Sequence, residues 1–345
     1  MAANDQGVVI GNEAVWTKVL NEREEGRKKE KALLGMDLVR IVAERADCAV
    51  HAVDILTEAL TAFGQGGSCS QHGWWTYHNS FLIADSKEAW VVETAGRWWV
   101  AERVAHGVRN ISNCLSIRSD FDRYSPGLFE YVKERGYWDG RGRFDWASAM
   151  STSPVPSPGR KQMGRERAGL GLMVSKSTRQ TKFNVEDMMD VLRDVESGIC
   201  MCADGGGFRS NASQVSILYG SGTDGDENAI KMKKKDIHWF TGTPDPSVSC
   251  FKPIVLPTPD EPDGNLGSDP QIQRVCDKVN ELAPRLWDRG DSLSNAGTRN
   301  VDALREIEQD LLRQVLDGHH SDTMVAAEKM IRDLWIHPVE RELQL

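Results

Sequence analysis

The pattern of apolar and polar positions in the first third of the chain predicts two helices followed by a sheet. Apolar residues recur at helical spacing in residues 34–42 and again in residues 47–63. Residues 77–84, 89–93 and 98–103 instead alternate apolar and polar positions around short polar turns, as strands of an antiparallel meander do. We therefore expect a helical pair beside a β-meander.

Two further short segments are expected to extend this sheet. The opening residues 7–11 are β-branched and bounded by glycines, which is typical of a short buried strand. Residues 108–112 predict another strand after the meander, with Asn113 at its end.

The middle of the chain is less regular. Residues 151–159 and the basic stretch beyond them are rich in proline, serine and glycine, which favours a surface loop. Asn184 is suited to cap a helix, because acidic residues follow it in the first turn. Residues 214–218 and 237–240 predict a hairpin.

Seven prolines between residues 244 and 270 indicate an irregular linker, and helical spacing resumes beyond it among many charges. This pattern predicts three parts: a folded domain over residues 1–253, a proline-rich linker over 254–270 and a helical tail over 271–345.

Composition excludes several classes of protein. The formal net charge of the 345 residues is -9, and the basic residues are scattered, so a nucleic-acid partner is not expected. No stretch of about 18 apolar residues occurs, and the first residues lack the pattern of a secretion signal. We expect a cytoplasmic protein without a membrane span.

No metal or cofactor motif is complete. The seven cysteines are irregularly spaced and are expected to be reduced. Cys200 and Cys202 have no second cysteine pair, and His319 and His320 lack ligand spacing. The glycine-rich stretches lack the Lys-Ser/Thr of a phosphate loop. We expect no cofactor and no metal.

Tryptophan is concentrated in and around the predicted meander. Large aromatic side chains on strands usually form core, but a substrate pocket is the alternative, with Trp98 as its candidate residue. The tryptophans of this group are Trp74, Trp75, Trp90, Trp98, Trp99 and Trp138.

The chain resembles the secernin family. Residues 3–18, ANDQGVVIGNEAVWTK, are similar to the secernin segment Ala-Asn-Glu-x-Gly-Val-x-Ile-Gly-Asn-Glu-Ala-Val-Trp-Thr-Lys. The other similar segments are residues 32–38, 64–67, 88–96, 109–117, 192–200, 241–247 and 251–253.

This resemblance implies an α+β fold, the four-layer α-β-β-α sandwich of N-terminal-nucleophile dipeptidases. Their nucleophile is a cysteine near the chain start, where its own α-amine can take the thiol proton. Met1 aligns with an internal methionine of the family, so we expect this chain to lack the nucleophile and the first strands of the sandwich. Cys48, at a predicted helix start, is expected to be structural.

The resemblance also suggests an accessory catalytic site. Asn113 resembles the residue whose amide helps to form the oxyanion hole in related amidohydrolases, and Asn12 is the second catalytic candidate. A turn or capping role is an equal alternative for both residues. Glu13 and Trp98 are the expected substrate-binding residues.

Two hypotheses for function follow from the resemblance. The first is a cysteine dipeptidase family member that cleaves a dipeptide or small amide in its complete form, with this chain inactive because it lacks the cysteine. The second is a non-catalytic interaction protein with protein partners, linked to regulated exocytosis.

Overall fold

The computed structural model describes residues 1–20, 32–70, 75–152, 161–179, 183–201, 209–219, 236–241, 245–247, 249–254, 256, 308–309 and 312–313. The chain divides into two compact units, Met1–Ser175 and Lys176–Leu345. The predicted boundaries at residues 253 and 270 stay predictions.

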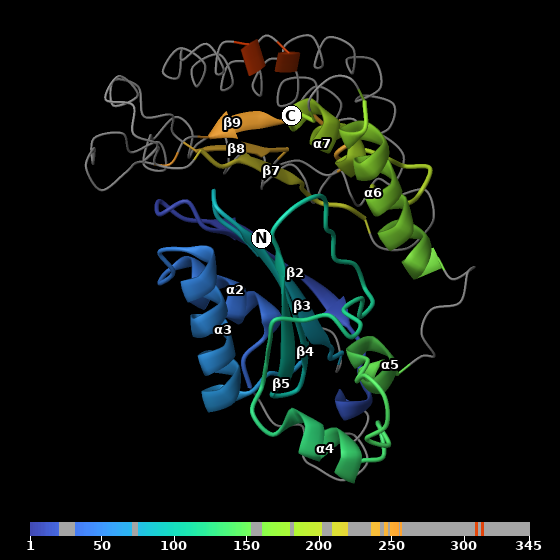
Figure 1. Ribbon diagram of the computed structural model, residues 1–345. Coiled ribbons are helices and arrows are strands. Elements are labelled where there is room, and N and C mark those ends of the chain that lie inside the picture. Colours follow the sequence, from blue (N-terminus) through green and yellow to red (C-terminus); the bar gives the residue numbers. More distant parts are fainter. Residues whose placement is uncertain are drawn as a thin grey trace. The chain divides into compact units, whose positions relative to one another are not determined.

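The first unit contains a six-stranded antiparallel sheet in which each strand pairs with the next along the chain (Figure 1). This order confirms the predicted meander. The strands are β1 (Ala2–Ala3), β2 (Val9–Val15), β3 (His78–Ala84), β4 (Ala89–Ala95), β5 (Trp98–Val104) and β6 (Arg123–Tyr124).

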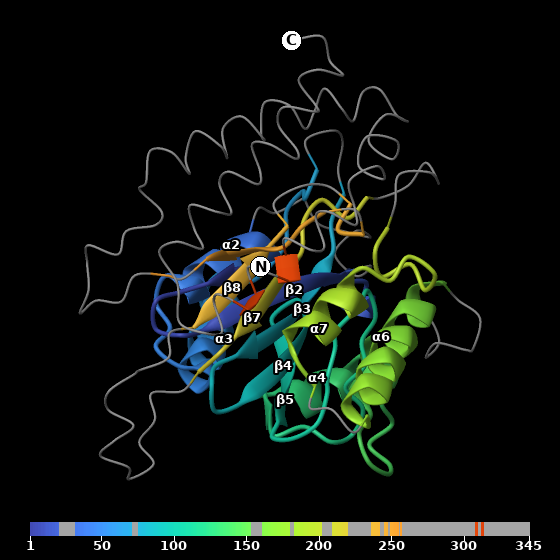
Figure 2. The ribbon, with the colours of Figure 1, turned by 90° about the horizontal axis from the view of Figure 1, so that it is seen from above.

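Helices cover both faces of this sheet. The predicted helical pair, α2 (Gly35–Ala43) and α3 (Ala49–Phe63), lies on one face, and α4 (Leu128–Glu134) and α5 (Trp146–Met150) lie on the other (Figures 1 and 2). A further helix, α6 (Lys161–Ser177), follows.

Each face has its own apolar core, because successive strand residues point to opposite sides of a sheet. Phe81 and Val92 pack with Leu56 of α3 on the first face. Val91 and Val100 pack with Trp146 of α5 on the second. Full burial of each such side chain stabilises the fold by about 1.5–3 kcal/mol.

The first turn of α3 is capped from a distant turn of the sheet. Cys48 is the N-cap residue and makes no side-chain capping bond, so its predicted place at a helix start is confirmed. Asp85, in the turn between β3 and β4, accepts a hydrogen bond of 2.8 Å from the Ala49 N–H. Asp47 bonds to His51 at 2.8 Å.

The predicted strand over residues 108–112 is wrong. Gly107 adopts a left-handed φ of 85°, which turns the chain after β5, and Arg109 directs its guanidinium back to Glu102 of β5. Of the residues in this range, Ser112 alone makes a β-bridge, and its partner is Cys114. The strand that pairs with β5 is β6. Asn113 therefore lies in a bend.

The basic stretch after residue 160 is a helix and not the predicted loop. Most residues of α6 are good helix formers, and helix propensity outweighs its scattered glycines. Residues 153–160 of the predicted loop lie outside the described residues.

The second unit contains a three-stranded antiparallel sheet, β7 (Gln214–Ile217), β8 (Ile237–Phe240) and β9 (Lys252–Ile254), in that order. The predicted hairpin is confirmed. Strand β9 was not predicted, and its Pro253 is tolerated because the strand lies at the sheet edge. Helix α7 (Val185–Leu192) packs on this sheet, and the predicted cap is confirmed, since Asn184 accepts a bond from the Asp187 N–H.

A buried ion pair lies inside the second unit. Arg193 Nη2 lies 2.6 Å from Glu308 Oε2, and the Phe251 N–H donates to the same oxygen at 2.6 Å. The backbone donor and the guanidinium together offset the cost of burying the carboxylate.

The helices and antiparallel sheets confirm the α+β class, whereas the four-layer arrangement stays a prediction. Among the described residues, no helix combines the length and the apolar character needed to cross a membrane. Cys202, the histidine pair 319–320 and most of the predicted tail lie outside the described residues.

Candidate functional site

The predicted site residues Asn12 and Glu13 are neighbours on β2, and their side chains point to opposite faces of the sheet. Asn12 points toward α2 and α3, where its Nδ2 donates to Asn79 Oδ1 at 2.9 Å. Glu13 points to the other face, where its carboxylate meets Asn113. The two residues cannot line one pocket, because adjacent strand positions lie on opposite sides.

A neutral hydrogen-bonded network surrounds Asn12. Asn79 Nδ2 donates to Gln65 Oε1 at 3.0 Å, and Gln65 Nε2 donates to Thr94 Oγ1 at 2.7 Å. Asn79, Gln65 and Thr94 are fully buried, and Gly35 at the start of α2 packs directly on the Asn79 side chain. We call these residues, with Asn12, the amide network. A satisfied network of this kind makes a core specific.

The opposite face carries a charged group that we call the Glu13 cluster, consisting of Glu13, Asn113 and Arg165. Asn113 Nδ2 donates to Glu13 Oε2 and to the Ala14 carbonyl, both at 3.0 Å. Arg165 Nη2, from α6, donates to Asn113 Oδ1 at 2.7 Å. Burial raises the pKa of Glu13, while the Arg165 charge and the Asn113 bond lower it. The acidic and basic groups are thus joined through one amide.

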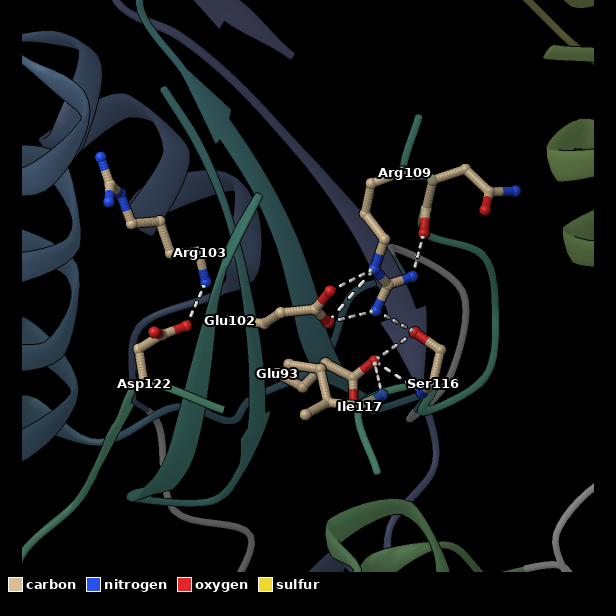
Figure 3. Close-up of polar contacts among 8 residues, drawn as sticks. Glu93, Glu102, Arg103, Arg109, Ser116, Ile117 and Asp122 are labelled. Carbon is tan, nitrogen blue, oxygen red and sulfur yellow. Dashed lines mark hydrogen bonds and ion pairs between the residues drawn. The ribbon is translucent and has the colours of Figure 1, made fainter. Parts of the chain in front are cut away.

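A second charged group, the Glu93 cluster, lies on the same face (Figure 3). Glu93 Oε1 accepts bonds from the Ser116 N–H at 2.6 Å and the Ser116 hydroxyl at 2.8 Å, and Oε2 accepts from the Ile117 N–H at 3.2 Å. Arg109 Nη2 donates to Ser116 Oγ and to Glu102 Oε2, both at 2.9 Å. A chain of contacts therefore joins Glu102 to Glu93.

Glu93 is fully buried on β4. Burial raises its pKa to about 7, although the bonds from Ser116 and Ile117 and the charge of Arg109 oppose this shift. A carboxyl group with this pKa changes its charge near neutral pH.

The two clusters are linked by sheet register and by one segment of chain. Glu13, Ser80 and Glu93 are direct neighbours across β2, β3 and β4, so their side chains share a face. The chain from Asn113 to Ser116 joins Glu13 at one end to Glu93 at the other.

Most residues of these two clusters lie in a part of the chain that matches a known family. Residues 4–156 match the model of peptidase family C69. The C69 region, as we call residues 4–156, contains Glu13, Asn113 and Glu93, whereas Arg165 lies just after it. The match supports a peptidase function and a peptide substrate.

Two other residues of the C69 region, Trp98 and Cys114, have side chains that could take part in binding or chemistry. Trp98 stacks on Tyr131 of α4 with ring centroids 4.4 Å apart, and it packs in the core of the second face. Its substrate-binding role stays a prediction. Cys114 follows Asn113, but burial and the charges of Glu166 and Glu93 raise its pKa to about 11. It is therefore a thiol at neutral pH, not a thiolate nucleophile.

Sequence reasoning missed Arg165 and Glu93. Arg165 was missed because it lies in the basic stretch that we expected to be a surface loop and that forms helix α6. Glu93 had a visible signal, since it is the one charge in the otherwise uncharged strand Ala89–Ala95. Within the described ranges, no group of three or more His, Cys, Asp or Glu side chains could hold a metal ion.

Proposed function

We propose that the C69 region carries the dipeptide-binding part of a secernin-type cysteine dipeptidase, with the Glu13 cluster as the substrate-binding part of its site. The single observation that carries the substrate assignment is the order of charge in this cluster. The Asn113 amide is hydrogen-bonded to the Glu13 carboxylate on one side and to the Arg165 guanidinium on the other. A dipeptide presents the complementary order of ammonium, peptide bond and carboxylate.

Each group of the substrate has a suited partner. The carboxylate of Glu13 can bind the α-ammonium, and the guanidinium of Arg165 can bind the terminal carboxylate in its planar fork. Both side chains are half-buried, which strengthens such contacts relative to bulk water.

Asn113 is proposed to face the peptide bond. Its Nδ2 now donates to Glu13 and to the Ala14 carbonyl, so a substrate carbonyl would replace one of these acceptors. An amide N–H in this position can stabilise the oxyanion that forms when a nucleophile attacks the carbonyl carbon. Cys114 keeps its proton at neutral pH and is therefore not the nucleophile; the secernin resemblance implies an N-terminal cysteine for that role.

The test measures dipeptide binding by calorimetry, together with release of free amino acids by the protein purified from its native source. Glu13→Gln and Arg165→Met are each expected to weaken binding of an unblocked dipeptide by ~10- to 100-fold, the worth of a charged hydrogen bond. Arg118→Met, which removes an exposed arginine paired with Asp145, is the matched control and should bind normally.

Blocked dipeptides separate the two contacts. An N-acetyl dipeptide should bind the unaltered protein as weakly as the free dipeptide binds Glu13→Gln. A dipeptide with a C-terminal amide should bind the unaltered protein as weakly as the free dipeptide binds Arg165→Met. Equal affinity for free and blocked dipeptides would contradict the proposed substrate. Absence of amino-acid release by the protein from its native source would contradict the proposed reaction.

The alternative of an exocytosis-linked interaction protein gains no supporting observation from the described residues.

A further inference from the structure

We propose that Glu93 is a positioning residue that holds the segment from Ser112 to Ile117 against the sheet, and so places Asn113 on Glu13. The inference rests on the proposed function only for the role of Asn113 in the site. The contacts, the sheet register and the length of the segment carry the rest.

The contacts show where the segment is attached. Glu93 accepts the Ser116 N–H, the Ser116 hydroxyl and the Ile117 N–H, and these are its hydrogen bonds among the described residues (Figure 3). Two backbone donors from consecutive residues set the direction of the chain at this point as well as its position. Arg109 donates a further hydrogen bond to the same hydroxyl oxygen.

The length of the segment matches the distance between Glu13 and Glu93. Glu13 and Glu93 lie in one row across the sheet, two strand spacings apart, or roughly 10 Å. Asn113 and Ser116 are three residues apart, and a fully extended chain spans roughly 10 Å over three residues. The segment bends at Asn113, and the side chains of Asn113, Glu13 and Glu93 supply the rest of the reach, so the short segment joins both carboxylates. Release at Ser116 would give Asn113 freedom to leave Glu13.

Other charges around Glu93 are already engaged in contacts of their own. Arg109 is shared between Glu102 and Ser116, and the core side chains of α4 and α5 on this face are apolar. The titratable groups that face Glu93 from neighbouring elements are Glu13 of β2, His78 of β3, Glu102 of β5, and Arg109 and Cys114 of the chain after β5.

The attachment is expected to depend on pH. With the segment closed, burial raises the pKa of Glu93 to about 7, whereas an open segment would expose the carboxyl to water and return its pKa toward 4.5. The closed form therefore binds the proton more tightly, and rising pH favours opening. The closed segment is most stable below about pH 4.5 and loosens as pH rises through about 7.

The test is amide hydrogen exchange at Ser116 and Ile117 between pH 5 and 8, corrected for the intrinsic pH dependence of exchange. In the unaltered protein, protection is expected to fall by up to ~70-fold over this range, from the linkage of the two pKa values. Glu93→Gln keeps one acceptor oxygen and cannot ionise, so its protection should be independent of pH. Glu93→Leu removes every acceptor, and its protection should be at least ~10-fold lower at pH 5.

Glu102→Gln is the matched control. It removes the carboxylate that pairs with Arg109 but leaves Glu93 in place, so the fall in protection with pH should persist. A fall that disappears in Glu102→Gln and persists in Glu93→Gln would overturn the proposal. So would loss of protection spread equally over β4 and α3, because a merely structural role of Glu93 predicts that outcome.

Dipeptide binding separates this inference from the proposed function. Glu93→Leu should weaken dipeptide binding at pH 5 by ~10-fold, and Glu93→Gln should restore it, if Glu93 acts by placing Asn113. Exchange that follows the expected pattern without any dipeptide binding would contradict the proposed function and leave the positioning role standing.

Discussion

The two faces of the six-stranded sheet handle buried polar groups in opposite ways. On the side of α2 and α3, Asn12, Asn79, Gln65 and Thr94 form a neutral network. On the other side, carboxylates and guanidinium groups surround the segment that carries Asn113. The same strands supply both sets.

The difference teaches which face can respond to its surroundings. Amides and hydroxyls do not ionise between pH 4 and 9, so their network stays the same over that range. Buried carboxylates such as Glu93 titrate near neutrality, and perturbed pKa values concentrate at functional sites. The neutral face makes the fold specific, and the charged face is the one suited to chemistry.

The largest expected loss of stability comes from a substitution that disrupts the amide network on the neutral face. In Gly35→Ala, the new Cβ would lie 1.9 Å from Asn79 Oδ1, and Asn79 cannot move without losing its bonds to Asn12 and Gln65. We expect a loss of about 4 kcal/mol in the free energy of unfolding, from overpacking and broken buried hydrogen bonds. Urea denaturation followed by tryptophan fluorescence measures this loss.

Gly164→Ala is the control, because Gly164 also lies in a helix and a Cβ there meets nothing within 4 Å. This substitution should stabilise α6 by about 0.5–1 kcal/mol. Similar effects of the two substitutions would show that Asn79 is not held rigidly.

The next effect sharpens the contrast through pH. The pKa of Glu93 rises from 4.5 unfolded to about 7 folded, so its contribution to stability is fully present below about pH 4.5 and is lost as pH rises to about 7. The loss is on the order of 3 kcal/mol. Denaturation midpoints at pH 5 and 8 should show a smaller difference in Glu93→Gln than in the unaltered protein. An unchanged difference would mean that Glu93 titrates normally.

The smallest effect tests the neutral face alone. Asn12→Ala removes one half-buried bond to Asn79 and should cost about 1 kcal/mol. Because Asn12 faces away from the Glu13 cluster, dipeptide affinity should stay the same within twofold. Strongly weakened dipeptide binding in a stable Asn12→Ala protein would show that Asn12 contributes to the substrate site, so that both faces of the sheet take part in function.

Local patterns in the sequence predicted much of the first unit. The helical pair and the strands of the meander formed where periodicity placed them, because each helix buries one face in a core and the strands bury side chains in the cores on both faces of the sheet. The strand over residues 108–112 failed because Gly107 turns the chain and Arg109 finds an ionic partner on β5. Tertiary contact there outweighed strand propensity.

The candidate site was only partly predictable. Glu13 and Asn113 came from the secernin resemblance, and the structure brings them within 3.0 Å. Asn12 could have been separated from Glu13 by the sequence alone, since adjacent strand residues alternate in direction. Arg165 could not have been found this way, because its contact spans 52 positions and depends on how α6 packs.

By itself, the sequence determined the periodicity of the elements, the α+β class and the similarity of residues 4–156 to a peptidase family, because these depend on local spacing and on segments that match as written. The tertiary structure alone decided that Asp85 caps α3, that Asn12 and Glu13 serve different faces, and that Glu93 and Glu13 attach one segment of chain. The physical reason is that burial, charge pairing and strand register act between residues distant in sequence, and only a folded chain brings those residues together.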